Sequence, residues 1–277
     1  MTGPSPGPGS GRFTALVLAG DRGPEDPLCR AAGVTHKCLV EVGGEPMVAR
    51  VVAALAASPW IGRIALSLND PALAAEIPGF QALIDQRRLT ALPTAESPSR
   101  SVLAALEGLD DPFPLLITTA DHALLTREMV DHFCAAGAGA DLDLAVGVTG
   151  SALLLRRYPQ SKRTFLAFRD ERYSGSNLFA LMTPAATAAV ELWKRAEQQR
   201  KRPWRLAAVF GPALLLSYLL RRLTLDEALE RISRRLGLSV AAVKMPFAEA
   251  AIDVDKPEDL ALVEEILRRE AGSGGPG

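Results

Sequence analysis

The chain has 277 residues, and its 48% hydrophobic content suffices for a buried core and argues against a disordered protein. Because 31 Lys and Arg residues balance 32 Asp and Glu residues, the net charge of -1 gives no general attraction for nucleic acid or an anionic membrane. Three cysteines, Cys29, Cys38 and Cys134, without paired spacing argue against disulfides or a zinc site and favour a reducing, cytoplasmic location.

The two ends of the chain differ in composition from its body. Residues 1–12 are rich in Gly, Pro and Ser and lack the apolar stretch of a secretory signal, so a disordered tail is predicted there. Residues 271–277 have the same composition and predict a second tail. Residues 13–270 are therefore expected to form a single domain.

In the first half of this body, short apolar runs alternate with helical segments. Residues 13–19 are continuously apolar and stop at Gly20, which predicts a strand buried on both faces. Residues 20–37 follow as a long loop without regular structure. Further strands are predicted at 61–68, 89–92 and 113–119, with helices at 46–57, 72–75, 99–106 and 125–136. This alternation predicts an α/β, Rossmann-like, doubly wound fold with a mostly parallel sheet.

The second half is more irregular. Strands are predicted at 143–148, 164–168 and 241–245, a break at 175–177, and helices at 184–200, 224–236 and 257–268. Residues 185–237 are expected to form a helical insertion. Within it, 206–223 is apolar but contains Gly211-Pro212 and is shorter than the roughly 20 residues of a membrane span. A buried helical hairpin is the favoured interpretation, and an apolar surface for a lipid-like acceptor or a membrane is the alternative.

The loop Leu18-Ala-Gly-Asp-Arg-Gly23 follows the first predicted strand. Backbone N–H groups at the carboxyl end of a parallel strand can bind phosphates, and Arg22 and Lys37 can neutralise their charge. A glycine-bearing turn is common, so this feature alone is weak evidence. The G-x-G-x-x-G pattern of a dinucleotide-binding dehydrogenase is absent, which disfavours that class.

Together with Lys37 and Gly44-Glu-Pro-Met47, this loop resembles the signature of the nucleotidyltransferase superfamily, and in particular the molybdenum-cofactor-guanylyltransferase-like (MobA-like) NTP transferases. The family's usual G-x-G-x-R-M run is replaced here by residues 21–26. The resemblance implies that Arg22 and Lys37 contact the triphosphate. It also implies a nucleotide-binding loop formed by Leu18, Ala19, Gly20, Asp21 and Gly23.

Two acidic residues match further parts of the family pattern. Asp121 follows the apolar run 113–119, where the family carries the aspartate that holds Mg²⁺, and hard cations prefer oxygen ligands. Asp255 lies in Asp255-Lys-Pro-Glu-Asp-Leu260, which is similar to the family's closing element and implies a second metal ligand opposite Asp121. Asp253 is a rival on the same strand face. Each aspartate could instead cap a turn or helix.

Two other segments supply candidate binding residues. Arg100 and Ser101 lie in a segment similar to the R-x-S-V-x-x-G-L motif of the methylerythritol-phosphate cytidylyltransferases, which implies contact with the nucleotide; an ordinary helix start is the alternative. The half of the chain where such enzymes hold the acceptor supplies four candidate acceptor-binding residues, Lys162, Arg163, Gly175 and Asn177. A solvated basic loop and a glycine turn are the alternative there. His122 adjoins Asp121 and is interpreted as a loop residue.

The resemblance implies a Mg²⁺-dependent nucleotidyltransferase that transfers a nucleoside monophosphate from CTP or GTP to a phosphorylated small molecule and releases pyrophosphate. No nucleic-acid partner is expected, and membrane contact stays open. The acceptor could be molybdopterin-like or a small alcohol or sugar phosphate, which the apolar insertion favours. The alternative is a non-catalytic nucleotide-binding or scaffold protein that keeps the fold. The altered first loop favours this alternative, whereas the retained Lys37, Asp121 and Asp255 favour the enzyme.

Overall fold

The computed structural model describes residues 12–199 and 211–273. The predicted tail up to residue 11, the last residues 274–277 and part of the predicted insertion, residues 200–210, lie outside the described residues. The closing helix α11 (Pro257–Ser273) continues three residues into the segment 271–277, for which a tail is predicted.

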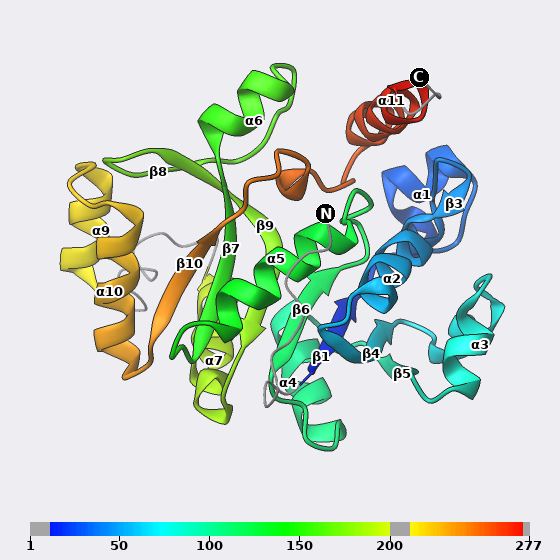
Figure 1. Cartoon of the computed structure of the whole chain (residues 1–277), viewed down its shortest axis with the longest axis horizontal. Coiled ribbons are helices and arrows are strands. Elements are labelled where there is room, and N and C mark those ends of the chain that lie inside the picture. Colours follow the sequence, from blue (N-terminus) through cyan, green and yellow to red (C-terminus); the bar gives the residue numbers. More distant parts are fainter. Residues whose placement is uncertain (1–11, 200–210, 274–277) are drawn as a thin grey trace.

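An eight-stranded sheet forms the centre of the molecule, in the order β10-β7-β9-β6-β1-β4-β5 with β8 paired to β9 (Figure 1). Strand β1 pairs in parallel with β4 and β6, as do β4 with β5 and β7 with β10, whereas β9 is antiparallel to β6, β7 and β8. The predicted mostly parallel α/β sheet is confirmed. The strands are β1 (Phe13–Leu18), β4 (Ile61–Leu68), β5 (Leu89–Pro93), β6 (Leu115–Thr119), β7 (Leu144–Gly150), β8 (Leu166–Ala167), β9 (Arg172–Leu181) and β10 (Val240–Lys244). A separate two-stranded hairpin comprises β2 (Glu41–Val42) and β3 (Glu45–Pro46).

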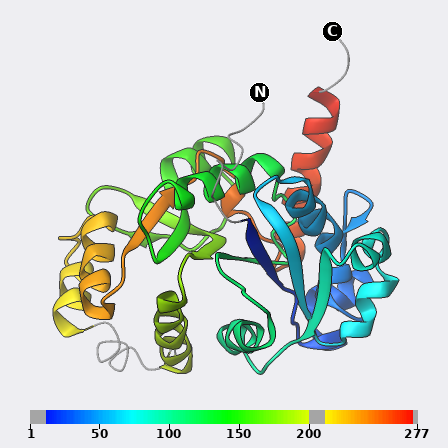
Figure 2. The same cartoon turned by 60° about the horizontal axis from the view of Figure 1, so that its bottom comes forward.

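Helices cover both faces of this sheet, as a doubly wound fold requires. Helices α2 and α5 lie over one face, while α4 and α7 lie under the other, and α11 projects from the body (Figures 1 and 2). The helices are α1 (Pro27–Ala32), α2 (Met47–Ala57), α3 (Phe80–Asp85), α4 (Pro98–Gly108), α5 (Arg127–Ala138), α6 (Ser151–Arg157), α7 (Thr187–Gln199), α9 (Pro212–Leu219), α10 (Leu225–Leu236) and α11. Short 3₁₀ segments are η1 (Gly23–Glu25), η2 (Lys37–Leu39), η3 (Pro71–Glu76), η4 (Pro184–Ala186) and η5 (Glu249–Ala251).

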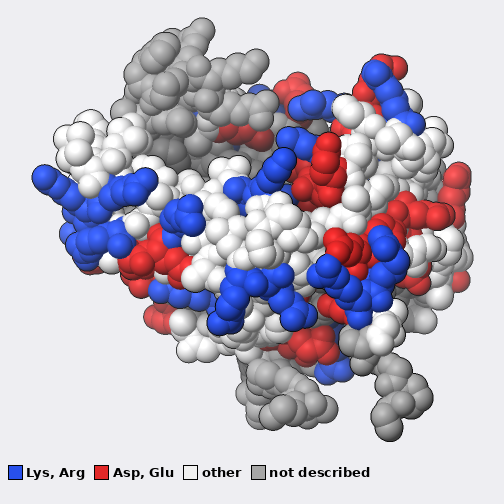
Figure 3. Space-filling model, turned by 90° about the horizontal axis from the view of Figure 1, so that it is seen from above, with Lys and Arg blue, Asp and Glu red and all other residues white. Residues whose placement is uncertain are grey.

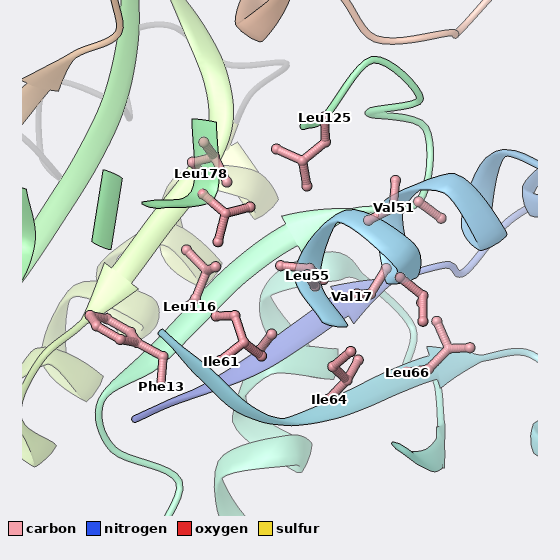
Figure 4. Packing of buried hydrophobic residues seen from close by; sticks show 14 of the residues in the cluster. Phe13, Val17, Val51, Leu55, Ile61, Ile64, Leu66, Leu116, Leu125 and Leu178 are labelled. Carbon is pink, nitrogen blue, oxygen red and sulfur yellow. The ribbon is translucent and has the colours of Figure 1, made fainter. Parts of the chain in front are cut away.

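Alternation along the strands divides the core between the two faces. On the upper face, Val51 and Leu55 of α2 pack on Val17 of β1 and on Ile64 and Leu66 of β4 (Figure 4). On the lower face, a second apolar cluster joins Leu16, Ala65 and Ile117 to α4 and α7. Because successive side chains of a strand point to opposite faces and helices cover both faces, β1 and β6 are mostly apolar, whereas β4 also carries Arg63 and Ser67.

The segment 20–37 is more ordered than the sequence suggested. The prediction of a loop without regular structure is wrong, because η1 and α1 lie within it. The carboxylate of Asp26 accepts a hydrogen bond from the N–H of Leu28, and Gly33 ends α1 with a φ of 69°. An Asp directly before a Pro is a pattern typical of the start of a helix, and a Gly after the six residues 27–32 is typical of its end. These signals were present in the sequence.

The expected break at 175–177 is also wrong. Strand β9 continues through these residues, with a register shift against β7 and an Asn177 φ of 48°. Between Val146 and Val148 of β7 the partner position moves from Phe179 to Gly175, so β9 carries two extra residues there, which a bulge absorbs by bending the strand without ending it. Conversely, strand β8 covers only Leu166–Ala167 of the predicted 164–168.

The described part of the apolar segment 206–223, residues 211–223, contains one helix, α9, and this helix is not buried as the favoured hairpin would require. Residues 206–210 lie outside the described chain, and helix α9 has no buried residue. Leu216, Leu219 and Leu220 are 58%, 67% and 52% exposed. Among the helices of the described chain, none combines the length and apolar character needed to cross a membrane.

Candidate active site

Three predicted site residues converge at the carboxyl ends of the central strands. The ammonium Nζ of Lys37 lies 2.7 Å from Oδ2 of Asp121 and 2.6 Å from Oδ1 of Asp255. Asp121 follows β6, the neighbour of β1, and the backbone N–H of Val254 donates to the carbonyl of Asp121 over 3.0 Å. This contact brings the closing element of the chain beside the end of β6, so that residues 84 and 218 positions from Lys37 reach it.

The ion pairs determine the charge states of this cluster. Burial lowers the pKa of Lys37, but the charges of Asp121 and Asp255 outweigh it, and the net pKa lies above its ordinary value. Burial raises the pKa of Asp255, and the hydrogen bond from Lys37 and the nearby cations outweigh this effect, so the net pKa is lowered. An ionised Asp255 therefore pairs with a protonated Lys37, whose ammonium also lies against Asp121.

The first loop is held in shape by the carboxylate of Asp21. This side chain, 2% exposed, accepts hydrogen bonds from the N–H groups of Gly23 at 2.7 Å and Lys37 at 2.8 Å. Asn69, at the end of β4, accepts from the N–H of Asp21 and donates to its carbonyl. Asp21 thus shapes the loop with its side chain and joins it to the chain around Lys37.

A cavity of ≈ 800 Å³, here called the β1 pocket, opens beside this loop. Leu18, Gly20, Asp21 and Arg22 line one side, and the chain between β5 and α4 lines another. A Cβ on Gly20 would lie 2.9 Å from Cγ2 of Thr94, closer than real Cβ atoms approach, so any other residue there would force the loop or Thr94 to shift. The remaining lining residues are Ser67, Asn69, Thr94, Ala95, Glu96, Ser97, Pro98, Arg100, Ser101, Glu197 and Gln198.

Arg100 and Ser101 both line the β1 pocket but have partners of their own. The guanidinium of Arg100 pairs with Glu96 at 3.1 Å, and both side chains are exposed. The Ser101 hydroxyl is buried and accepts a hydrogen bond from the N–H of Ala95 at 2.9 Å. Ser101 therefore fixes the chain before α4, and its proton stays available to a ligand. Of the other loop candidates, Ala19 is buried, and Gly23 has a φ of 72°.

A second cavity of ≈ 830 Å³, the β9 pocket, lies on the other side of the lysine–carboxylate cluster. All four predicted acceptor residues line it, together with Asp255. Asp21 lines the β1 pocket and bonds the N–H of Lys37, while Asp255 lines the β9 pocket and bonds its ammonium. Lys37 therefore lies between the two cavities. The lining residues are Gln160, Ser161, Lys162, Arg163, Thr164, Leu166, Ser174, Gly175, Asn177, Ala251, Asp253, Asp255, Lys256, Glu258, Asp259 and Leu262.

Asp253 holds two of the predicted acceptor residues. Its carboxylate forms an ion pair with Arg163 and accepts a hydrogen bond from the Asn177 amide at 2.8 Å. The side chain of Arg163 is 10% exposed and also donates a hydrogen bond to the carbonyl of Ala251. It therefore holds the chain just before the closing element in place. The rival for the metal role, Asp253, is thus neutralised by Arg163, whereas Asp255 meets Lys37.

The residues present fit a cation at Asp121 and Asp255. The two carboxylates already converge on one positive atom, and Oδ1 of Asp121 is buried without a hydrogen-bond partner. Within the described chain, no group of three or more His, Cys, Asp or Glu side chains could hold a metal ion. Mg²⁺ commonly binds through one or two carboxylates and completes its shell with water and substrate phosphates, so a pair suits it.

Charge elsewhere on the surface is mixed. Figure 3 shows Lys and Arg side chains interspersed with Asp and Glu on one face of the described chain. Opposite charges at this spacing largely cancel beyond a Debye length of about 8 Å, so charge on that face acts locally.

Comparison with known proteins decides the family. The model of the MobA-like NTP transferase domain matches residues 15–240. The chain belongs to this family. Its fold also matches a hypothetical transferase from Thermus thermophilus, with 31% identity, a TM-score of 0.72, and coverage of 90% of this chain and 99% of that one. The predicted relationship to the MobA-like enzymes is confirmed. No curated protein matches the chain.

More distant structures share the fold of this family. One is 4-diphosphocytidyl-2C-methyl-D-erythritol synthase from Anaerococcus prevotii, at 13% identity and TM-score 0.57, covering 93% of this chain and 97% of that chain. Another is a CMP:2-keto-3-deoxy-manno-octonic acid synthetase complexed with CTP, at 11% identity and TM-score 0.56, covering 94% and 100%. At these identities the likeness concerns the fold alone.

Several residues of the site were not anticipated from the sequence. Asn69 follows β4 at the same edge of the sheet as Asp121, and its position at a strand end was the available signal. Lys256 lines the β9 pocket and directly follows Asp255. Glu197 reaches the β1 pocket from α7, far along the chain, and nothing in its local sequence marks it.

Proposed function

We propose that this member of the MobA-like family is a Mg²⁺-dependent nucleotidyltransferase that transfers a nucleoside monophosphate from CTP or GTP to a phosphorylated small-molecule acceptor. One observation carries the proposal. Two carboxylates, Asp121 just beyond β6 and Asp255 just before α11, meet at Lys37, between two cavities of similar size. A transfer between two substrates needs two binding sites and a charged centre between them.

The β1 pocket is the proposed donor site. Arg22 lines it without a hydrogen-bond or ion-pair partner in the described chain, so its guanidinium is available to a phosphate. Glycine at position 20 lets the loop lie against Thr94 and keeps its backbone close to a ligand. Lys37 stands where the α-phosphate would meet both cavities.

The β9 pocket is the proposed acceptor site. Lys162 and Lys256 line it and are exposed, and neither has an ion-pair partner in the described chain. The hydroxyl of Ser161 is buried, lines the same cavity and has no partner. These groups can bind an acceptor phosphate, whereas Arg163 and Asn177 orient the pocket wall through Asp253.

In the proposed reaction, an acceptor phosphate oxygen attacks the α-phosphorus in line. A new P–O bond forms, the bond from the α-phosphorus to the bridging oxygen breaks, and pyrophosphate leaves. Asp121 and Asp255 would hold Mg²⁺, which supplies charge neutralisation at the α-phosphate. Lys37 contributes its own positive charge beside the same atom. The chain positions and neutralises, and no covalent intermediate on the protein is required.

The test begins with donor binding and continues to turnover. Melting temperatures of the purified protein are measured with CTP, GTP, ATP and UTP, each with and without Mg²⁺, because a ligand of the native state stabilises it. A Mg²⁺-enhanced shift with one nucleotide is expected. Pyrophosphate release is then measured with that nucleotide and a panel of sugar and polyol phosphates. Binding without release from any acceptor would favour a non-catalytic nucleotide-binding protein, and no shift at all would refute the donor site.

A further inference from the structure

One carboxylate of the β1 pocket has no role in the proposed phosphate chemistry. Glu197 of α7 lines this cavity, and its Oε2 accepts a hydrogen bond from the Ser99 hydroxyl at 2.6 Å. Ser99 is fully buried at the start of α4, and Ser97 lies 3.2 Å from its hydroxyl. The serine therefore holds the carboxylate in place at the cavity wall, where α4 and α7 meet.

The second oxygen of Glu197 is available to a ligand. Within the described residues, Oε1 has neither a hydrogen bond nor an ion pair, and Arg100, a cation of the same wall, pairs with Glu96 instead. A carboxylate repels a polyphosphate, so the phosphates of a nucleotide in this cavity lie away from Glu197, near Arg22. The end of the nucleotide that meets Glu197 must carry N–H or O–H donors.

A second unpaired group lines the same cavity. Ser67 is 1% exposed, and its Oγ has no hydrogen-bond partner. It lies two residues beyond Ala65, which packs with α4 and α7, so its side chain points to the same face of the sheet. Buried hydroxyls are rarely left without a partner, and an unpaired one in a cavity indicates a missing ligand.

We propose that Glu197 selects guanine as the base of the donor nucleotide, an inference that rests on the β1 pocket being the donor site. Among the four common bases, guanine alone presents two adjacent donors, N1–H and the 2-amino group, which match the free Oε1 and the second lone pair of Oε2, whose first accepts from Ser99. The Ser67 hydroxyl can donate to an acceptor atom of the same base. GTP is then the preferred donor over CTP, ATP and UTP.

A purely structural role for Glu197 predicts something different. If the carboxylate only joins α7 to α4 through Ser99, its replacement lowers stability and leaves the choice of nucleotide unchanged. The test therefore measures nucleotide preference. Glu197→Gln keeps the acceptor for Ser99 but replaces one oxygen by an N–H₂ donor, which matches the N1–H and 2-carbonyl of xanthine instead of guanine.

The experiment is calorimetric binding, with Mg²⁺, of GTP, CTP, inosine triphosphate and xanthosine triphosphate to the full-length chain. Inosine lacks the 2-amino group, so the wild type should bind GTP about tenfold more tightly than inosine triphosphate. Glu197→Gln should lose this difference and prefer xanthosine triphosphate. The matched control is Glu191→Gln on the same helix, whose carboxylate pairs with Lys194 away from the pocket; it should behave as wild type. Ser99→Ala, which frees the carboxylate, should reduce the preference for GTP over inosine triphosphate.

The outcomes separate this inference from the proposed function. Tight, Mg²⁺-dependent binding of another nucleotide with no change in Glu197→Gln would overturn guanine selection and leave the transferase standing. A lower melting temperature of Glu197→Gln with unchanged preference would also overturn it, since that is the structural role. If none of the four nucleotides binds, both the proposal that the β1 pocket is the donor site and the inference of guanine selection are contradicted. If Glu197→Gln does not fold, unchanged preference in Ser99→Ala decides against the proposal.

Discussion

The ammonium of Lys37 lies 2.7 Å from Oδ2 of Asp121, and a second carboxylate oxygen, from Asp255, lies on it at 2.6 Å. A lysine between two carboxylates occupies the position that a divalent cation would take between the same oxygens. If the proposed Mg²⁺–nucleotide complex binds here, Lys37 would exchange its carboxylate partners for phosphate oxygens. In both arrangements the negative charges are balanced, because the positive charge of a bound Mg²⁺ would be accompanied by the negative charge of the nucleotide phosphates.

Loss of the Asp121 charge should abolish the metal dependence of nucleotide binding. In Asp121→Asn, an amide replaces the proposed Mg²⁺ ligand, whose Oδ1 is buried and unpaired in the described chain. We expect most Mg²⁺-dependent turnover to disappear while the far-UV circular dichroism stays native. The measurement compares the nucleotide-induced rise in melting temperature with and without Mg²⁺. Turnover near that of the wild type would remove Asp121 from the metal site.

Removing the Lys37 charge should affect the donor more than the acceptor. Lys37→Gln removes the cation that pairs with Asp121 and Asp255. The two carboxylates then repel each other and also repel the incoming triphosphate. We expect KM for the nucleotide to rise more than KM for the acceptor, with kcat also lowered. Lys162→Gln is the matched control, because it removes one charge from the β9 pocket and should raise chiefly the acceptor KM. An equal rise of both constants in Lys37→Gln would indicate that the lysine acts by holding the fold.

The sequence was sufficient for the fold and the residues of the charged centre. Continuous apolar runs fix the buried parallel strands, and the carboxyl ends of such strands share one edge, so Asp121 could be placed near the first loop. The insertion was harder, because an apolar segment has the same composition whether it is buried or exposed. Leu216 and Leu219 are exposed on α9, a result that depends on tertiary packing.

Pairings between distant residues were beyond sequence reasoning. Arg163 was expected to bind the acceptor, yet Asp253, 90 positions further on, neutralises it. Glu197 reaches the β1 pocket because α7 packs against α4, which depends on how the two helices lie under the sheet. Residue type and spacing identify groups that carry charge, whereas the packing of the helices determines which charges remain free.

Gly20 of the first loop lies close to Thr94 at the end of β5, and this contact can be tested by one substitution that creates a clash and a second that relieves it. In Gly20→Ala, the added Cβ would lie 2.9 Å from Cγ2 of Thr94, so the loop or the strand end must shift. We expect a destabilisation of about 1–3 kcal/mol and weaker nucleotide binding. The double variant Gly20→Ala, Thr94→Ser lacks the opposing methyl group and should recover much of both. Urea denaturation and nucleotide binding check this, and failure of the second change to rescue would show that the clash is not the cause.

Stability should depend on pH through His122. This side chain is 1% exposed, neither ring nitrogen has a hydrogen-bond partner, and burial lowers its pKa from 6.5 to about 4 despite the charge of Asp121. In the unfolded chain the His122 imidazole becomes protonated below pH 6.5, whereas in the folded chain it stays neutral until about pH 4. The free energy of unfolding should therefore be fully present above pH 6.5 and fall by roughly 3 kcal/mol as the pH approaches 4.

His122→Leu isolates this effect, because leucine does not titrate and fits a buried site. Carboxylates with lowered pKa, such as Asp143, lose their contribution only as the pH falls below their ordinary value of 3.8. Between pH 6.5 and 5, the change in the free energy of unfolding with pH therefore comes mainly from histidine. Urea denaturation of both proteins at intervals across this window should give a sloping profile for the wild type and a flatter one for His122→Leu. Parallel profiles would mean that His122 takes up its proton as easily in the folded chain as in the unfolded one, against the burial seen beside Asp121.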